Sequence, residues 1–359
     1  MAVETLHIKE FRNIADQAWN LAPGLNVLEG ENAQGKTNFL EALYYLANGR
    51  SFRVSEGESL IRFGQPSAEL RALWSSDGLE HRLRMRLFPE GRKVEYQQKE
   101  VVRLTPIQAQ LRVLVFTPDS SMLFRSSPTL RRRYLDHAIS LQFPGYSSLL
   151  SRYQRVLRQR NQVLEMGGGS ELETTFDLQW AETALALMEE RRRYLQALEV
   201  PWRERVQWLL GESPEIEWRW DGPLYRKGAQ DLDSLLSVLE EVKFDERRRG
   251  QSLLGPQRDD LAILWTNRPV KEVASQGQQR MLVIALKLAE ADLFQAQYGK
   301  PPVFLLDDLG SELDSRHQGL LLEILGELKA QTVLTSAQKG AFSTLHARTF
   351  WVQAGRLSE

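Results

Sequence analysis

A glycine-rich loop between a short strand and an amphipathic helix constrains this chain more than any other feature. The loop reads GENAQGKT at residues 30–37, the strand is predicted at residues 25–28, and apolar residues recur at helical spacing from Phe39 to Leu46. Glycines let backbone N–H groups converge on an anion, and the N-terminus of the following helix adds a positive dipole. The pattern predicts a phosphate-binding loop in an α/β domain.

The chemistry of that loop assigns a role to two side chains. Lys36 would reach the β- and γ-phosphates of a nucleoside triphosphate, and the hydroxyl of Thr37 would bind Mg²⁺. The residues expected to surround the phosphates are Gly30, Glu31, Asn32, Ala33, Gln34, Gly35, Lys36 and Thr37.

A second anchor for magnesium is expected on a neighbouring strand. Residues 303–306 are uniformly apolar, as in a parallel strand that is buried on both faces, and Asp307 and Asp308 follow directly. Open α/β sheets bind ligands at the carboxyl ends of their strands. Asp307 would therefore hold Mg²⁺, and Asp308 would orient or deprotonate the attacking water.

The segment SQGQQ at residues 275–279 precedes a predicted helix from Met281 to Phe294. Ser275 is a suitable N-cap for that helix, whose first N–H groups could then face an anion. The segment resembles the signature loop of ABC-type ATPases, and this resemblance assigns the signature residues Ser275, Gln276, Gly277 and Gln278. It also assigns Ser311 and Asp314 to the D-loop.

The domain organisation follows from a change of pattern along the 359 residues. Residues 60–118 look rich in strands, whereas helical spacing dominates from Leu149 to Leu195, with a Gly-rich turn at residues 167–170 and an end before Pro201. We therefore expect an α/β head formed by residues 1–118 and 251–359. A mainly helical domain, residues 119–250, would be inserted into it and contain a short antiparallel helical hairpin.

Charge is sorted along the chain although the formal net charge is −1. The stretch from Arg125 to Arg160 holds eight arginines and one acid, Asp136. Two interpretations remain open: a surface that binds nucleic acid phosphates, or arginine stems that cover apolar surface. The candidate DNA contacts are Arg131, Arg132, Arg133, Arg155 and Arg158.

Several sequence blocks from residue 6 to residue 314 resemble the RecF family of SMC-like ABC ATPases. The blocks are LHIKEFRN at 6–13, the phosphate loop with Asn38, GRSFR at 49–53, SPTLRRRYLD at 127–136 and GPQRDD at 255–260. Ala33 and Gln257 depart from the family, which usually has Gly and His there. The resemblance adds Arg12, Asn13 and Asn38 to the nucleotide-binding residues.

The resemblance implies how such a protein works. ATP with Mg²⁺ would be bound between two copies of the chain, with the signature loop of one copy completing the site of the other. Hydrolysis would be slow and stimulated by DNA. The resemblance further implies binding to double-stranded and gapped DNA, and action with RecR and RecO to help load RecA in recombinational repair.

Other functions are less compatible with the sequence. A chain without cysteine has no disulfide scaffold, thiolate metal site or cysteine nucleophile. No stretch approaches the ~20 apolar residues of a membrane span, so we expect a cytoplasmic protein without a membrane partner. The resemblance to the RecF family implies that it associates with the nucleoid. The alternatives are the nucleotide-binding subunit of a transporter, an SMC-type structural ATPase with long coiled coils, and a small-molecule kinase.

Overall fold

The computed structural model describes residues 1–53, 60–143, 145–167, 169, 171–211, 215–308, 315–342 and 346–359. The chain forms two compact units. The first unit consists of Met1–Ser120 and Ala291–Glu359, and the second unit consists of Ser121–Glu290. The sequence predicts that the C-terminal part of the head begins at residue 251, but the structure assigns residues 251–290 to the second unit.

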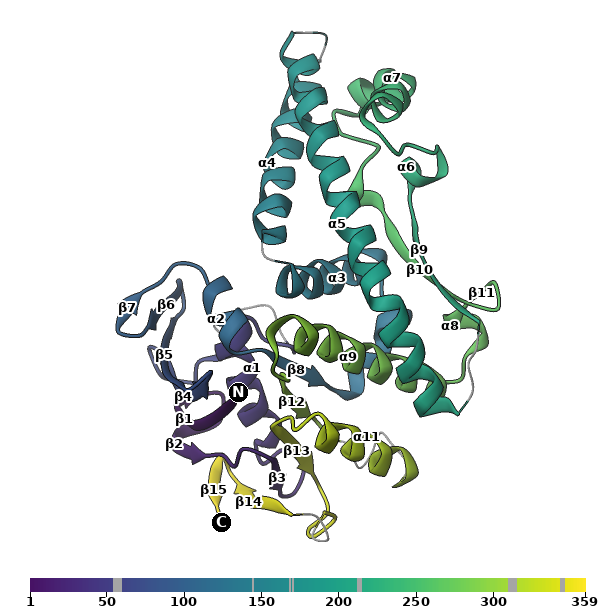
Figure 1. Ribbon diagram of the computed structural model, residues 1–359. Coiled ribbons are helices and arrows are strands. Elements are labelled where there is room, and N and C mark those ends of the chain that lie inside the picture. Colours follow the sequence, from purple (N-terminus) through teal and green to yellow (C-terminus); the bar gives the residue numbers. More distant parts are fainter. Residues whose placement is uncertain are drawn as a thin grey trace. The chain divides into compact units, whose positions relative to one another are not determined.

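The first unit contains two six-stranded sheets (Figure 1). One is antiparallel, in the order β2-β1-β4-β5-β6-β7. Its strands are β1 (Ala2–Phe11), β2 (Ile14–Asn20), β4 (Ala68–Ser76), β5 (Leu79–Phe88), β6 (Gly91–Tyr96) and β7 (Lys99–Glu100). Alternating burial along β4 and β5 shows that one face of this sheet packs inward.

The other sheet is parallel except for its last strand and has the order β15-β14-β3-β13-β12-β8. Its strands are β3 (Leu25–Glu29), β8 (Val113–Phe116), β12 (Val303–Leu306), β13 (Thr332–Ser336), β14 (Ala347–Gln353) and β15 (Arg356–Ser358). The sequence predicts that the acidic pair follows a strand next to β3, but β13 lies between β3 and β12.

Helix α1 (Lys36–Asn48) lies in the apolar core that both sheets share. Phe39 of α1 meets the edge of Trp19 from β2 at 5.8 Å, and Trp19 meets Phe350 of β14 at 6.0 Å. Because both sides of the helix are covered, its residues from Phe39 to Asn48 are all buried. The other helices in the described part of this unit are α2 (Thr105–Gln110), α11 (Ser315–Glu327) and the C-terminal end of α9 (Gln276–Tyr298).

The second unit is built on a helical hairpin, as the periodicity predicts. Helix α4 (Tyr146–Glu165) packs against α5 (Glu171–Leu210), and α7 (Leu232–Arg249) packs against both (Figure 1). The other elements are η2 (Pro118–Phe124), α3 (Pro128–Gln142), α6 (Pro223–Arg226), η3 (Pro256–Arg258) and α8 (Val270–Val273). A three-stranded sheet of β9 (Ile216–Asp221), β10 (Asp260–Trp265) and β11 (Arg268–Pro269) was not predicted.

That sheet explains the shifted boundary, because β10 pairs in antiparallel register with β9 and ties residues 260–265 to the second unit. The prediction that the second arm of the hairpin ends before Pro201 is wrong, since α5 continues to Leu210. Trp202 is buried beyond the proline, donates from Nε1 to the Leu282 carbonyl at 3.2 Å and packs on Trp218. These contacts offset the backbone hydrogen bond that a proline removes from a helix.

Candidate nucleotide-binding site

The phosphate loop lies at the carboxyl end of β3 and leads into α1, as predicted. Gly30 has a φ of 153°, and a Cβ atom there would lie 2.4 Å from the Val352 carbonyl oxygen. Gly35 is the left-handed N-cap of α1 and bears no capping side chain. The first N–H groups of the helix therefore point at the loop without a side-chain acceptor, which is the arrangement that binds phosphate.

Ala33 is the one strained position of the loop. Its φ is 64°, in the left-handed region that costs a residue with a Cβ atom about 1–2 kcal/mol. The family usually has Gly at this position, so the substitution seen in the sequence falls where glycine would be most favourable.

Lys36 lies over the loop with its ammonium group directed at the backbone. Its Nζ donates to the carbonyl oxygens of Gly30 at 2.6 Å and Glu31 at 2.7 Å. Burial lowers the pKa of Lys36, and the carboxylates of Asp307 and Asp308 oppose that shift. A partly desolvated cation beside a loop of N–H donors is suited to a polyphosphate.

Thr37, Asp307 and Thr335 form a cluster of oxygens beside the loop. Both threonine hydroxyls donate to Oδ1 of Asp307, each at 2.9 Å. Burial raises the pKa of Asp307, while these two hydrogen bonds act in the opposite direction. The cluster joins α1, the end of β12 and β13. Strand β13, which lies between β3 and β12, therefore contributes Thr335 to the site.

Asp308 follows in the left-handed conformation, with a φ of 52°, and its N–H donates to Oγ1 of Thr335 at 2.8 Å. Aspartate tolerates this conformation better than most residues. Thr335 of β13 also donates to Asp307, so its hydroxyl positions both acidic residues.

A cavity of about 910 Å³ opens over these groups, all within the first unit. That volume lies in the range of small-molecule sites. Of the predicted nucleotide-binding residues, those that line it are Arg12, Asn13, Asn32, Ala33, Gly35, Lys36, Thr37, Asn38, Asp307 and Asp308. Gly30, Glu31 and Gln34 accept hydrogen bonds through their carbonyls, from Lys36 in the first two cases and from Asn13 in the third.

Arg12 and Asn13 support the loop from the turn between β1 and β2. The guanidinium of Arg12 makes two hydrogen bonds with the buried Glu41 of α1, at 2.7 and 2.9 Å. Asn13 donates to the Gln34 carbonyl at 3.2 Å and accepts from the Asn38 side chain at 2.8 Å. Motif residues far from the loop in sequence therefore fix its conformation.

The signature segment lies in the second unit, at the N-terminus of α9. Ser275 Oγ accepts from the Gln278 N–H at 3.2 Å, and the Gln278 side chain accepts from the Ser275 N–H at 2.9 Å. This reciprocal capping agrees with the predicted N-cap. Ser275, Gln276 and Gly277 are exposed. The predicted D-loop residues, Ser311 and Asp314, lie outside the described residues.

The arginine-rich stretch divides into two groups. Arg131 forms a two-pronged ion pair with Asp260 at 2.5 and 2.7 Å, and Arg132 donates to the Asp259 carbonyl at 2.5 Å. These contacts connect α3 with residues 259–260, so the guanidinium groups of both predicted DNA contacts already have partners within the chain. Arg133, Arg155 and Arg158 are exposed, and within the described part of the chain they have no ion pair or hydrogen-bond partner.

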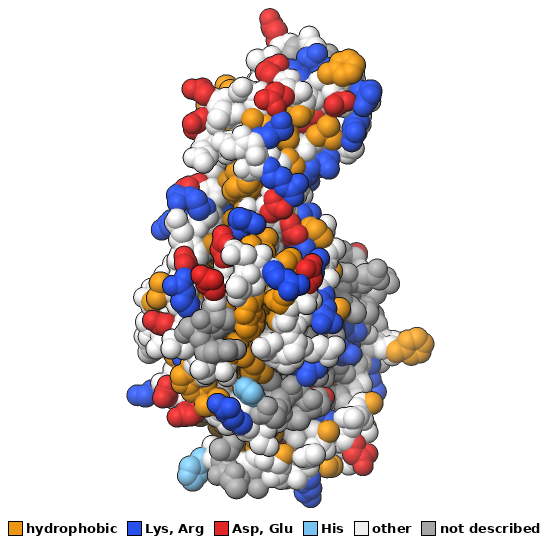
Figure 2. Space-filling view, turned by 90° about the vertical axis from the view of Figure 1, so that its right-hand side faces the viewer, with side chains coloured by type: hydrophobic (Ala, Val, Ile, Leu, Met, Phe, Trp, Pro, Cys, Tyr) orange, Lys and Arg blue, Asp and Glu red, His pale blue; other side chains and the backbone are white. Residues whose placement is uncertain are grey.

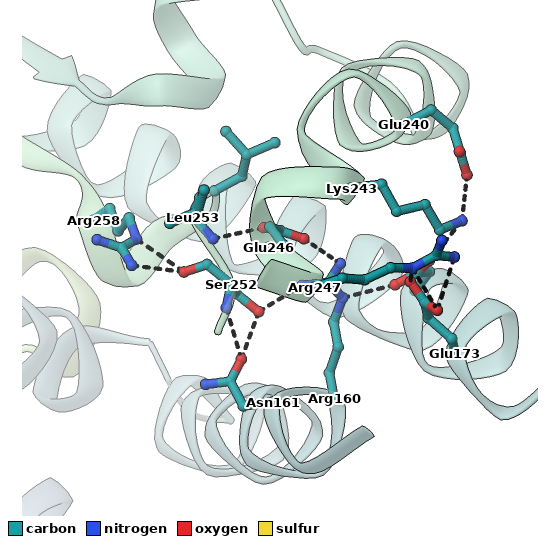
Figure 3. Close-up of polar contacts among 12 residues, drawn as sticks. Arg160, Asn161, Glu173, Glu240, Lys243, Glu246, Arg247, Ser252, Leu253 and Arg258 are labelled. Atoms are coloured by element: carbon teal, nitrogen blue, oxygen red, sulfur yellow. Dashed lines mark hydrogen bonds and ion pairs between the residues drawn. The ribbon is translucent and has the colours of Figure 1, made fainter. Parts of the chain in front are cut away.

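Arg160, at the end of the same stretch, is fully buried. It donates to Asp177 at 2.7 Å, Glu246 at 2.6 Å and Ser252 at 2.6 Å, so it joins α4, α5, α7 and the segment after α7. Figure 3 shows Arg160 and Asn161 of α4 facing Glu246 and Ser252, with Arg247 and Lys243 on the neighbouring turns of α7. Buried charges are tolerated because each is paired.

Comparison with known proteins agrees with this geometry. The model of the family described as RecF/RecN/SMC N terminal domain matches residues 2–354. The DNA replication and repair protein RecF of Geobacter metallireducens is 36% identical over 344 residues, covering 94% of this chain and 93% of that protein. That of Trichlorobacter lovleyi is 33% identical over 362 residues, covering 100% and 98%. The chain belongs to the RecF family.

Solved structures agree with this membership. The recombination mediator protein RecF with ATP, described as part of the RecFOR pathway, superposes with a TM-score of 0.88 at 27% identity, covering 99% of this chain and 97% of that one. An Smc head bound to the C-terminal winged-helix domain of ScpA has a TM-score of 0.55 at 15% identity and shares the fold. The predicted ABC-type head of the SMC-like class is thus confirmed. Within the described residues, no helix is long and apolar enough to span a membrane.

Proposed function

We propose that this RecF-family chain is an ATP-dependent DNA-binding protein of recombinational repair. ATP binding would join two copies of the chain, and slow, DNA-stimulated hydrolysis would release them. The joined form would bind duplex and gapped DNA and, with RecR and RecO, help load RecA. The observation that carries this proposal is the group formed by Lys36, Thr37, Asp307 and Thr335 around the cavity.

The oxygens of Thr37 and Asp307 fit Mg²⁺. They lie 2.9 Å apart, which matches the edge of an octahedron with metal–oxygen bonds of 2.0–2.1 Å, about 2.9 Å. Both are hard oxygen donors of the kind that Mg²⁺ prefers. A magnesium ion held there would neutralise charge on the β- and γ-phosphates.

The remaining residues have roles that follow from their positions. Lys36 and the N–H groups at the start of α1 would hold the phosphates. Asp308, which is positioned by Thr335, would accept a proton from the attacking water. Its carboxylate is one methylene shorter than the Glu usual in transporters, and we therefore expect slow turnover.

The signature loop supports a site that is completed by a second copy. A Cβ atom at Gly277 would meet nothing closer than Ser275 Oγ at 3.9 Å, so packing within the chain does not require glycine there. Glycine in a helix is unfavourable relative to alanine by about 1 kcal/mol. A glycine at an exposed helix N-terminus is explained if a phosphate group of the partner's nucleotide approaches the backbone.

Exposed arginines support the DNA contact. Arg133, Arg155 and Arg158 offer charge that is not neutralised by an acid in the described part of the chain. Elsewhere, on the face drawn in Figure 2, basic and acidic side chains lie next to one another, so their charges largely balance. The RecF protein whose ATP-bound structure superposes on this chain acts in the RecFOR pathway, which supports the assignment of RecR and RecO as partners.

Sedimentation with and without ATP tests the proposal. The wild-type protein should dimerise and bind gapped duplex with ATP, whereas Ser275→Arg should bind ATP but remain monomeric. Ser147→Arg is the matched control, because it adds the same side chain to an exposed first turn of α4. A wild-type chain that stays monomeric at saturating ATP, or a control that fails equally, would contradict the proposal.

A further inference from the structure

Phe63 is an aromatic residue at the nucleotide cavity with no role so far. It lines the cavity, yet its relative exposure is 101%, the highest among the large apolar residues described as exposed. An exposed Phe gains none of the free energy that burial of such a side chain provides. A ligand that covers the ring would recover part of this free energy.

The backbone holds Phe63 firmly beside the phosphate loop. The Arg12 N–H donates to the Leu60 carbonyl and the Arg62 N–H donates to the Glu10 carbonyl, both at 2.8 Å. An ion pair of 3.2 Å between Arg62 and Glu10 adds to this pairing. Residues 60–62 are therefore fixed to Glu10 and Arg12 at the end of β1, directly before the Asn13 that supports the loop.

A tight turn then presents the ring. The Gln65 N–H donates to the Arg62 carbonyl at 3.0 Å, and Gly64 has a φ of 81°. Glycine at the third position of a four-residue turn permits that conformation. Phe63 occupies the corner of this turn, so its position is defined by the backbone although its side chain is exposed.

The cavity has groups of two kinds. Lys36, Thr37 and Asp307 are suited to polar and charged atoms. Among the described residues, the apolar side chains that line the cavity, apart from Ala33, are Ile61, Phe63 and Pro89. A nucleoside triphosphate has the same division, with a charged end and a flat aromatic base. Aromatic rings stack on nucleobases through their faces.

We propose that the ring of Phe63 stacks on the base of the bound nucleotide and sets the affinity for the nucleoside part. This inference rests on the proposed ATP site and adds the residue that recognises the base. Lys36 would hold the phosphates independently, so the two parts of the ligand can be tested separately.

The experiment compares two probes, etheno-ATP, whose fluorescence changes on stacking, and inorganic tripolyphosphate. Binding is measured with Mg²⁺ in the Ser275→Arg background, so that dimer formation does not contribute. Phe63→Ala should weaken etheno-ATP binding about tenfold and leave tripolyphosphate binding unchanged, since base stacking contributes ~1–3 kcal/mol. Phe63→Tyr should restore the affinity. Phe244→Ala, which removes an exposed ring from α7 in the second unit, should have no effect.

The outcomes separate the two proposals. If wild type binds both probes and Phe63→Ala binds etheno-ATP normally, or loses both probes equally, stacking is overturned and the ATP site stands. If the protein binds neither probe, the ATP site itself is wrong and the inference fails with it. In a chain that keeps Ser275, a Phe63→Ala variant with normal ATP affinity but lost dimerisation would also overturn stacking, and it would assign the ring to contact with the partner copy.

Discussion

The phosphate loop and the arginine-rich stretch use charged side chains in opposite ways. Around the loop, Lys36 and Asp307 face a cavity and are held there by backbone carbonyls and hydroxyls. In the second unit, Arg131 pairs with Asp260 and connects α3 with β10, whereas Arg160 pairs with Glu246 and connects α4 with α7. The comparison shows that charge alone does not mark a binding site, because the partner of each charge decides its role.

The largest expected effect comes from the buried arginine. Arg160→Met should lower the free energy of unfolding of the second unit by about 3–5 kcal/mol, because Asp177 and Glu246 would remain buried without their partner. Urea denaturation followed by circular dichroism measures this. Arg158→Met, on the same helix but exposed, should change stability by less than about 0.5 kcal/mol. Equal effects of the two variants would remove the distinction between the two groups of arginines.

Lys36→Ala should reduce ATPase activity by roughly 100-fold, because the variant removes the cation that binds the phosphates. Stability should not fall, since burial already disfavours the charged form of Lys36 and lowers its pKa. Steady-state hydrolysis and thermal denaturation measure the two effects, with the exposed Lys9→Ala of β1 as control. A variant that hydrolyses ATP normally would refute the assignment of the site.

Asp259 provides a test by pH. Burial of the carboxyl group raises the pKa of Asp259 to about 7. The nearby acids Asp221 and Asp136 add to this rise, whereas the positive charges of Arg191 and Arg132 oppose it. The ordinary value is about 3.9, so the folded protein binds an extra proton between these values and stability falls as pH rises from about 4 to 7. Asp259→Asn should therefore be more stable than wild type at pH 8, on the order of 2 kcal/mol, and this advantage should shrink towards pH 4.

Urea denaturation at pH 5 and pH 8 measures this difference, and Asp233→Asn, at an exposed position of the same unit, serves as the surface control. If Asp259→Asn is destabilised at pH 8, the buried carboxylate is needed in its charged form by Arg191. In that case the ion pair between Asp259 and Arg191 would stabilise the second unit by more than the burial of the Asp259 charge destabilises it.

The exposed arginines should affect DNA binding and not folding. Combined Arg155→Ala and Arg158→Ala should weaken binding to duplex DNA about tenfold and reduce the slope of log affinity against log salt by about 2. Fluorescence anisotropy over a salt series measures both quantities. Arg192→Ala is the control, because its guanidinium pairs with Glu189 on α5. An unchanged slope would show that α4 does not contact phosphates.

Ala33→Gly should have the smallest effect. Relief of the left-handed strain at φ 64° should stabilise the first unit by about 0.5 kcal/mol, after the greater chain entropy of glycine is counted. Chemical denaturation measures it, and Ala42→Gly within α1 should do the opposite, at a cost of about 1 kcal/mol. Destabilisation of Ala33→Gly would mean that the Ala33 side chain makes contacts that outweigh the strain.

The sequence by itself determined the phosphate loop, the acidic pair after β12 and the cap at Ser275. These depend on local rules: glycines that turn a backbone, an apolar run that becomes a buried strand, and a serine that caps a helix. Their chemistry is set within a few residues, so it can be predicted from spacing.

Only the tertiary structure decided which charged residues remain accessible. Neighbouring residues Arg131, Arg132 and Arg133 differ in role because helix rotation and the pairing of β9 with β10 place Asp259 and Asp260 beside two of them. The same holds for α5, which continues past Pro201 because Trp202 finds buried contacts, and for Thr335, which β13 places between two parts of the site. Such roles depend on partners that are distant in sequence, and spacing along the chain does not identify them.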